Sequence, residues 1–260
     1  MTSPPSVYET QGPHASPYTA WLKYCNEREV LKTAFEQRFG EWAGTRNEQN
    51  LSIVDMGSGA GVSARRITDI LDIHGRKYSF TAVDPYQEQL DQFRAWAGED
   101  YFQYVRAGFE DFVPERKYDL ALAIHSLYYA QNMEAALTKI HSFAERAMIV
   151  HHGRQGLCTV QSQFPHHVKS KNKWDSTYAD VTAVLDSLGI PYRTTFHDAD
   201  LDVSSCKDPT NQEGVDLIKF LVDNATLSEK EVGEVRAFVK TLPDHFIHDI
   251  GLIITTPLEL

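Results

Sequence analysis

Short apolar runs alternate with longer amphipathic segments along most of this 260-residue chain. The runs are rich in Val, Ile, Phe and Ala, which is typical of strands buried on both faces of a sheet. In the longer segments, apolar side chains recur every three or four residues, which indicates helices. The pattern therefore predicts repeated β–α units, and such units build a parallel sheet covered by helices.

Seven strands are expected, at residues 51–55, 79–84, 103–106, 119–124, 147–150, 191–196 and 247–255. Helices are expected at residues 18–42, 62–71, 87–97, 133–144, 178–188, 214–224 and 229–241. Ser228, with Glu231 three residues later, forms a capping-box pattern before the last helix. The predicted fold class is α/β: a doubly wound, Rossmann-like, seven-stranded sheet, mostly parallel with an antiparallel last strand. An N-terminal helix and a small lid or substrate region would complete it.

Domain organisation follows from where this alternation begins and where it loosens. Residues 1–17 are polar and rich in proline, and we expect a flexible N-terminal tail there. Residues 18–260 are expected to form a single domain. After His151 the chain becomes polar and loses its period over 153–175. We therefore expect lid or substrate insertions at about 153–177 and 198–245.

A glycine-rich turn follows the first expected strand. It reads Asp55-Met56-Gly57-Ser58-Gly59-Ala60-Gly61, with glycines at alternate positions. Glycines let the backbone lie close to a ligand, because a Cβ at these positions would push the ligand away. The dinucleotide fingerprint needs a glycine at its sixth place, where this chain has Val62, so a nicotinamide cofactor is disfavoured. The spacing instead resembles the first motif of S-adenosylmethionine (SAM)-dependent methyltransferases.

A carboxylate ends the second expected strand. Asp84 stands 29 positions after Asp55, and one carboxylate can accept hydrogen bonds from both hydroxyls of a ribose. Together with the glycine turn it predicts a nucleoside cofactor, with SAM as the expected molecule. Gln89, five residues further on, is in reach of the base. Glu110 or its neighbouring backbone is a candidate for the adenine amino group, and a solvated acidic turn is the alternative.

The segment Leu127-Tyr128-Tyr129, after the fourth strand, resembles histamine N-methyltransferase. Val83-Asp84-Pro85 with Glu88-Gln89 is similar to that family's cofactor segment, and 200–206, 214–217 and 246–250 are similar to its substrate region. The resemblance implies cofactor contacts and a pocket for an amine. Its cofactor residues would be Gly57, Asp84, Gln89 and Ile124. Tyr18, Tyr128 and Tyr129 would wall the amine pocket, with Glu27 or Glu29 near the charged end of the substrate.

The chain also departs from that family. His248 stands where the family has an asparagine facing the acceptor, and His125 where it has a glutamine. We take Glu27 or Glu29, with His125 or His248, as candidates to orient the acceptor and relay its proton, because histidine titrates near neutral pH. Of the family's lid tryptophans only Trp174 remains. Arg154 can clamp a carboxylate, so an amino-acid acceptor is an alternative to a bare amine.

The amino-acid composition of the chain limits the kinds of molecule that it is expected to bind. A net charge of −11 argues against nucleic acid, whose phosphates need basic faces. Three widely spaced cysteines give neither a disulfide framework nor a zinc spacing, and the histidine pairs lack supporting ligands, so no metal is expected. No apolar run approaches the ~20 residues of a membrane span, and no signal peptide is visible, so we expect a cytoplasmic protein.

The predicted function is methyl transfer from SAM to a nitrogen of a small molecule. The acceptor would be an amine or imidazole, histamine-like or histidine-like. Two alternatives stay open at this point. One is transfer to oxygen or carbon of a secondary metabolite, and the other is a SAM-binding sensor without catalysis.

Overall fold

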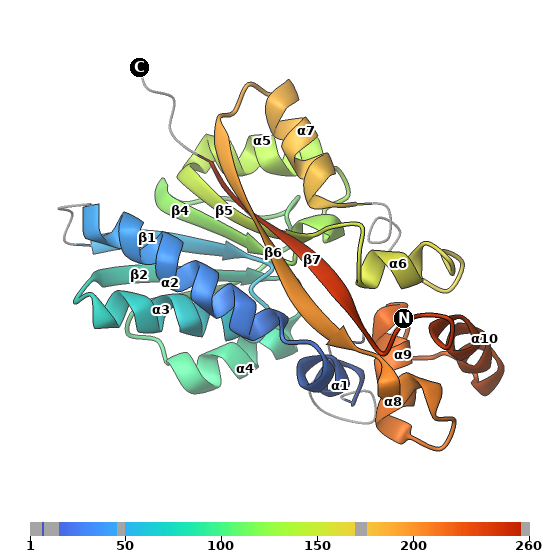
Figure 1. The fold of residues 1–260 in the computed structure, drawn as a ribbon. Coiled ribbons are helices and arrows are strands. Elements are labelled where there is room, and N and C mark those ends of the chain that lie inside the picture. Colours follow the sequence, from blue (N-terminus) through green and yellow to red (C-terminus); the bar gives the residue numbers. More distant parts are fainter. Residues whose placement is uncertain (1–6, 8–15, 46–49, 170–175, 256–260) are drawn as a thin grey trace. The chain divides into compact units, whose positions relative to one another are not determined.

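A computed structural model describes residues 7, 16–45, 50–169 and 176–255 of the chain. Its strands form one seven-stranded sheet in the order β3-β2-β1-β4-β5-β7-β6 (Figure 1). The strands are β1 (Asn50–Met56), β2 (Lys77–Asp84), β3 (Phe102–Arg106), β4 (Tyr118–Ile124), β5 (Ala144–His152), β6 (Tyr192–Asp202) and β7 (His245–Thr255). The ladders from β3 to β5 are parallel, and the last strands are antiparallel. The predicted fold class is therefore confirmed.

The register of the central strands decides what meets at the carboxyl edge of the sheet. Met56 of β1 pairs with Val83 of β2, so the segments that follow these two strands leave the sheet side by side. In the same way, Ile124 of β4 pairs with Val150 of β5. The carboxyl ends of parallel strands are where open α/β sheets bind their ligands. The glycine turn, Asp84 and the segment after β4 all lie at that edge.

Most helices lie close to their predicted bounds. They are α1 (Ser16–Tyr24), α2 (Glu27–Thr45), α3 (Val62–Ile73), α4 (Gln87–Ala97), α5 (Met133–Phe143), α6 (Leu157–Gln161), α7 (Tyr178–Ser187), α8 (Ser204–Lys207), α9 (Gln212–Leu221) and α10 (Glu229–Val239), with a 3-10 turn η1 (Leu127–Tyr129). The predicted capping box of α10 is present, because the side chains of Ser228 and Glu231 each accept from the other's backbone N–H. The capping box thus fixes where α10 begins.

The expected single helix over 18–42 is wrong in its middle. Cys25 leaves the helix to form an isolated antiparallel bridge with Leu201. Asn26 then donates its backbone N–H to the carbonyl of Asp200, and its side-chain oxygen accepts the N–H of Asp200 in return. These long-range bonds replace helical ones, so α1 ends and α2 begins anew at Glu27. Helical periodicity cannot reveal such a break, because the apolar spacing continues through it.

The region 153–175 was expected to lack regular structure, and α6 corrects that expectation over its five residues. The helix is too short to show a period in the sequence, which is also why η1 and α8 were missed. Both β5 and β6 are longer than predicted. β5 begins at Ala144 rather than at residue 147 and ends two polar residues later, at His152, and β6 continues past residue 196 through a largely polar stretch to Asp202.

The chain divides into two compact units. One comprises residues 31–151, 178–196 and 251–260 and carries the glycine turn, and we call it the glycine-loop unit. The other comprises residues 1–30, 152–177 and 197–250, and we call it the Glu27 unit. Several elements begin in one unit and end in the other. The single-domain boundary expected from the sequence stays a prediction.

Apolar side chains fill both faces of the sheet in the glycine-loop unit. On one face Phe80 and Phe102 pack with Phe93 of α4, at ring-centroid separations of 5.5–6.0 Å. On the other face a larger cluster includes Val54, Leu137 of α5 and Leu185 of α7. Burying large apolar side chains on both faces explains why these strands read as continuous apolar runs.

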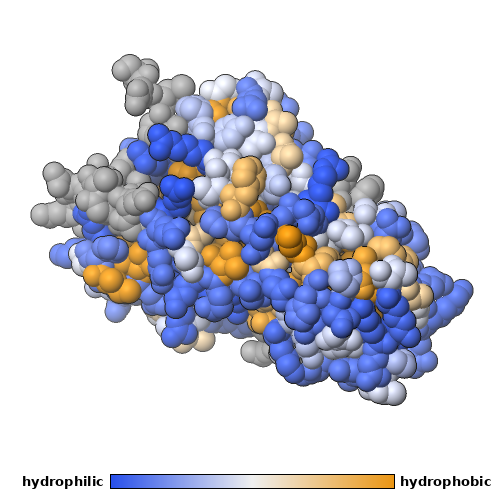
Figure 2. Space-filling view, in the orientation of Figure 1, coloured by the Kyte–Doolittle hydropathy of each residue, from blue (hydrophilic) through white to orange (hydrophobic). Residues whose placement is uncertain are grey.

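Polar side chains dominate the face shown in Figure 2, with apolar residues in separate patches between them. Such a mixture is ordinary for a folded protein, whose surface always keeps some apolar atoms. Among the helices of the described residues, none combines the length and the hydrophobicity that crossing a bilayer requires.

Candidate active site

The glycine turn is a tight loop built on left-handed backbone. Gly57, Gly59 and Gly61 have φ of +76°, +54° and +77°. The backbone N–H groups of Gly57 and Ser58 both donate to the carbonyl oxygen of Val83, at 2.8 and 3.0 Å. Glycine adopts positive φ without the cost that a side chain imposes. The loop therefore leaves β1, turns against the end of β2 and enters α3.

The three glycines are needed for different reasons. An added Cβ at Gly57 would lie 2.5 Å from Ser126 Cβ, and one at Gly61 would lie 2.6 Å from the ring of Phe93. At Gly59 the nearest atom is Gln89 Oε1, at 3.8 Å. The glycine spacing predicts that all three positions make room for a ligand. Packing within the protein explains two of them, and only Gly59 faces open space.

We expect Gly61→Ala to lower the free energy of unfolding by about 1–3 kcal/mol more than Gly75→Ala does, because a methyl group would overlap the Phe93 ring. Gly75 is a matched control, since its φ is +64° but a Cβ added there would meet nothing within 4 Å. Urea unfolding of both variants measures the difference. Equal losses would mean that backbone strain alone requires glycine at position 61.

Asp84 ties the loop to the end of β2. Its Oδ2 accepts the backbone N–H of Gly59 at 2.9 Å, and its Oδ1 accepts that of Tyr86 at 2.9 Å. Burial raises the pKa of this carboxyl, and the two backbone hydrogen bonds partly offset the rise. The glycine turn and the acidic strand end, two separate signals in the sequence, are therefore one structure, in which the carboxylate holds the loop in place.

The loop suits an adenosyl group. Gly59 leaves room in front of its backbone, and the Asp84 carboxylate stands beside it as a hydrogen-bond acceptor. Ser58 Oγ, between the first two glycines, is buried and has no hydrogen-bond partner among the described residues. A buried hydroxyl of this kind is a ready donor or acceptor for a polar ligand. Sequence reasoning missed Ser58, although its place inside the glycine motif was the available signal.

Asp55 is buried at the end of β1. Burial and the nearby charge of Asp84 raise the pKa of its carboxyl to about 8. The group is therefore mostly protonated at neutral pH, and it can donate a hydrogen bond as well as accept one. Its predicted place beside the cofactor stays a proposal.

The raised pKa of Asp55 makes stability depend on pH. The folded protein holds this proton up to about pH 8, whereas the unfolded chain releases it near its ordinary pKa of about 4. The contribution of the Asp55 proton to the free energy of unfolding is therefore complete below pH ~4. As the pH rises towards 8 this contribution is lost, by up to ~1.4 kcal/mol per pH unit. Asp55→Asn removes this slope. In urea unfolding from pH 5 to 7, the free energy of unfolding should fall for the wild type and stay more nearly constant for Asp55→Asn. Parallel pH profiles of the two proteins would contradict the raised pKa of Asp55.

The other predicted cofactor residues lie on three elements. Gln89 lies in the first turn of α4, with its Oε1 towards Gly59. Glu110 is exposed, and its Oε1 accepts the backbone N–H of Gln131 at 2.7 Å. Ile124 is half-buried at the end of β4. The bond to Gln131 gives Glu110 a structural task, and its contact with adenine remains a proposal.

The segment after β4 gathers aromatic and imidazole rings. His125 has φ +51°, uncommon for a side-chain-bearing residue, and its N–H donates to the carbonyl of Val150 at 3.0 Å. Tyr128 is buried, and its ring meets the rings of Tyr129 and His151 at 4.7 and 5.2 Å. Tyr129 is 45% exposed. His151 was not predicted, although a histidine pair that ends an apolar strand was a signal for it.

In the Glu27 unit the structure brings two predicted residues together. Glu27 Oε2 lies 3.2 Å from His248 Nε2, and both side chains are buried. On its other side, His248 Nδ1 lies 3.4 Å from the carbonyl of Gln155. Gly156 packs so closely on the imidazole that an added Cβ would lie 2.3 Å from Nδ1. Residues far apart in sequence thus fix one buried carboxylate–imidazole pair.

A chain of aromatic rings leads away from one side of this pair. Trp21 meets His248 edge-on at 5.2 Å and stacks on Phe220 at 4.9 Å. Tyr18 stacks on the same Phe220 at 6.0 Å, and its hydroxyl accepts from Arg28 at 2.9 Å. Aromatic rings close to a buried carboxylate are a setting that suits cationic or flat polar molecules. Trp21 and Phe220 were not among the predicted site residues, because in the sequence they look like ordinary core positions.

The remaining predicted residues lie elsewhere. Glu29 is exposed on α2, so the structure sets Glu27, not Glu29, against His248. Arg154 is exposed between β5 and α6. Trp174 lies outside the described residues. Over the described part of the chain, no three His, Cys, Asp or Glu side chains gather as metal ligands would.

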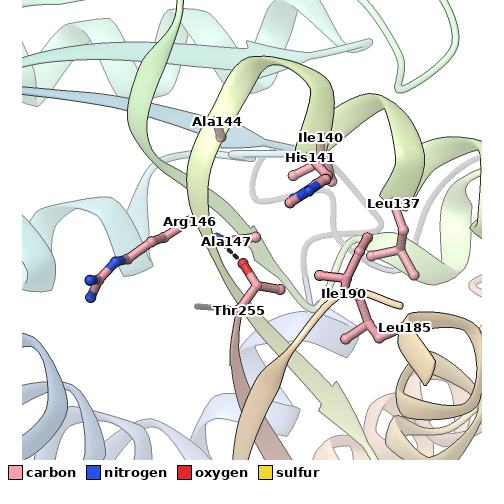
Figure 3. Close-up of a pocket in the computed structure, with 9 residues that line it drawn as sticks. All are labelled: Leu137, Ile140, His141, Ala144, Arg146, Ala147, Leu185, Ile190 and Thr255. Atoms are coloured by element: carbon pink, nitrogen blue, oxygen red, sulfur yellow. Dashed lines mark hydrogen bonds between the residues drawn. The ribbon is translucent and has the colours of Figure 1, made fainter. Parts of the chain in front are cut away.

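A small hollow lies at the other end of the sheet (Figure 3). Leu137 and Ile140 of α5, Leu185 of α7, Ile190 and Arg146 help to line it. It borders the first residues of β5, whereas ligands of such sheets bind beyond the carboxyl ends. The hollow therefore lies away from the carboxyl edge of the sheet, where the cofactor is expected.

Comparison with known proteins agrees with this geometry. The family model described as "Methyltransferase domain" matches residues 26–176. The chain belongs to this methyltransferase family. It is therefore a SAM-dependent methyltransferase, and the enzyme class and cofactor predicted from the sequence are confirmed. The resemblance to histamine N-methyltransferase amounts to 20–25% identity, which shows the methyltransferase class but not the acceptor.

The curated relatives of this chain include histamine N-methyltransferases. The one from Mus musculus is 20% identical over 255 residues, covering 89% of this chain and 86% of the relative. The one from Danio rerio is 25% identical over 149 residues, but the match spans only 47% of that relative and 55% of this methyltransferase.

Solved methyltransferase structures share the fold. BH2331 from Bacillus halodurans is 11% identical with a TM-score of 0.64, covering 86% of this chain and 99% of that one. The plantazolicin methyltransferase BpumL, solved with S-adenosylhomocysteine (SAH), is 15% identical with a TM-score of 0.54, covering 92% and 90%. At these identities the likeness concerns the fold of this methyltransferase and leaves its acceptor open.

Proposed function

We propose that this methyltransferase transfers the methyl group of SAM to a nitrogen of a small molecule. The acceptor is an amine or an imidazole, histamine-like or histidine-like. The observation that carries the proposal is the buried Glu27–His248 pair, 3.2 Å apart and walled by Trp21. Relatives named histamine N-methyltransferase support the same acceptor class.

In the glycine-loop unit, the cofactor is held by the loop and by Asp84. The open face of Gly59 admits the adenosyl group, Asp84 accepts from the ribose hydroxyls, and Gln89 and Glu110 are proposed to approach the base. When bound, SAM supplies a methyl group on a positively charged sulfur that leaves with the bonding electrons. Ile124, Tyr128 and Tyr129 are proposed to contact the cofactor or the acceptor, and a tyrosine face suits a cationic sulfur.

In the Glu27 unit, the carboxylate–imidazole pair prepares the acceptor. A protonated amine has no lone pair, so it must lose its proton before its nitrogen can attack the methyl carbon. Glu27 attracts the charged nitrogen, and His248 accepts the proton that the nitrogen gives up. Tyr18 and Trp21 hold the organic part of the acceptor against their rings. Holding a nucleophile in place contributes up to ~7–11 kcal/mol in the best intramolecular reactions.

Two kinds of acceptor fit this proposal: an amine without a carboxylate, such as histamine, and an amino acid with one, such as histidine. Arg154 is exposed next to α6, and a guanidinium binds a carboxylate through two parallel hydrogen bonds. An amino acid such as histidine would use that contact, whereas histamine would not. His125, from the glycine-loop unit, is a second candidate to orient the acceptor nitrogen.

Methyl transfer from SAM to histamine and to histidine tests the proposal. We expect turnover of at least one of them, with mass spectrometry of the product locating the new methyl group on nitrogen. Turnover only of acceptors methylated on oxygen or carbon would overturn the nitrogen assignment. Calorimetric SAM binding without turnover across a panel of amines and amino acids would instead favour a sensor.

A further inference from the structure

Gln161, the last residue of α6, has a buried side-chain amide that the described residues leave without a hydrogen-bond partner. The residue is 0% exposed, and neither its amide oxygen nor its amide nitrogen has a hydrogen-bond partner among the described residues. A buried amide without partners is costly, so native proteins rarely keep one unless a bound molecule completes its hydrogen bonds. Both ends of the same amide are unsatisfied here, which points to a ligand that offers a donor and an acceptor.

The helix that carries Gln161 belongs to the cluster around the Glu27–His248 pair. Gly156, the N-cap residue before α6, packs on the imidazole of His248. The helix α6 also contacts α9, and Phe220 of α9 stacks on Trp21, which in turn meets His248. Gln161 is thus fixed within the Glu27 unit by the same elements that fix the pair.

We propose that Gln161 is a specificity-determining residue that hydrogen-bonds a neutral polar group of the acceptor. The inference rests on the proposed function, and it adds that the site recognises a neutral polar group of the substrate. A neutral side-chain amide donates and accepts but carries no charge, so its partner is a group with both a donor and an acceptor, such as a neutral imidazole ring. A site built in this way rejects analogues that lack the polar group, because the amide is then left unpaired.

The experiment compares Gln161→Met, which keeps size and removes hydrogen bonding, with Gln163→Met at an exposed position two residues away. The probes are histamine as substrate and 2-phenylethylamine, which has the same amine but an apolar ring, as competitive inhibitor. For Gln161→Met we expect the KM for histamine to rise at least ~10-fold and the inhibition constant of 2-phenylethylamine to fall. The dissociation constant of SAM and the behaviour of Gln163→Met should stay at wild-type values.

Thermal unfolding without ligands supplies the second readout. An amide without a protein partner can be removed without harm, so Gln161→Met should keep or raise the melting temperature. A clear fall would show that the amide is paired inside the protein and would overturn the proposal. So would an unchanged KM for histamine, which would mean that water alone satisfies the amide. If the wild type methylates neither histamine nor histidine, the proposed function itself fails, whereas turnover with an unchanged Gln161→Met overturns only this inference.

Discussion

Asp84→Ala is expected to weaken SAM binding by about 10²- to 10⁴-fold. The carboxylate accepts the backbone N–H groups of Gly59 and Tyr86 and is proposed to accept the ribose hydroxyls as well. Hydrogen bonds to a charged group contribute about 1.5–3 kcal/mol each, and each 1.4 kcal/mol changes affinity tenfold. Losing the two proposed hydrogen bonds from the ribose hydroxyls therefore accounts for the expected range. Titration calorimetry with SAM measures it directly.

Two further variants keep that experiment interpretable. Asp84→Asn retains one acceptor oxygen, so its affinity for SAM should fall between those of the wild type and Asp84→Ala. Asp91→Ala removes an exposed carboxylate from α4, and it should bind SAM within about threefold of wild type, because surface charges contribute little. If Asp84→Ala remains folded by circular dichroism and binds SAM as the wild type does, Asp84 has no place in the cofactor site.

Glu27→Gln is expected to lower kcat for methyl transfer to histamine or histidine by about 10²- to 10⁴-fold, the usual contribution of a positioned acid or base. Glutamine keeps the size of the side chain but cannot hold the negative charge beside His248. The SAM dissociation constant should not change, because the substitution lies outside the glycine loop. Steady-state kinetics together with calorimetry separates the two effects.

Glu29→Gln is the matched control for that variant. It removes an equivalent carboxylate two residues away on the exposed side of α2, so kcat should stay close to wild type. Equal losses in both variants would mean that the negative charge of this helix end, rather than the buried pair, matters for turnover. A loss confined to Glu29→Gln would transfer the proposed role to that residue.

The sequence and the structure differ most instructively at the glycines and the N-terminal helix. Alternate glycines after a strand were enough to predict the loop, because positive φ there favours glycine. They could not reveal that Ser126 and Phe93 occupy the space beside Gly57 and Gly61. In the same way, the break at Cys25 depends on bonds to residues 200 and 201, which no local pattern contains.

In the candidate acceptor site, too, long-range contacts decide what local sequence patterns could not predict. The choice between Glu27 and Glu29 depends on which one faces His248, more than two hundred positions later in the chain. The amide of Gln161 lacks a partner among the described residues because it is buried, and the burial of a residue on a five-residue helix cannot be predicted from the sequence. Polar residues on a short helix look alike in the sequence whether they are exposed or enclosed.

The amino-acid sequence by itself determined the alternation of strands and helices, the glycine loop, the acidic end of β2 and hence the SAM-dependent class. These signals are local, because periodicity, backbone freedom and strand-end chemistry are properties of neighbouring residues. Only the tertiary structure decided that Asp84 holds Gly59, that Glu27 meets His248, and that Gln161 is enclosed without a partner among the described residues. Those contacts join distant parts of the chain, and burial then changes the protonation and the hydrogen-bonding needs of the groups involved.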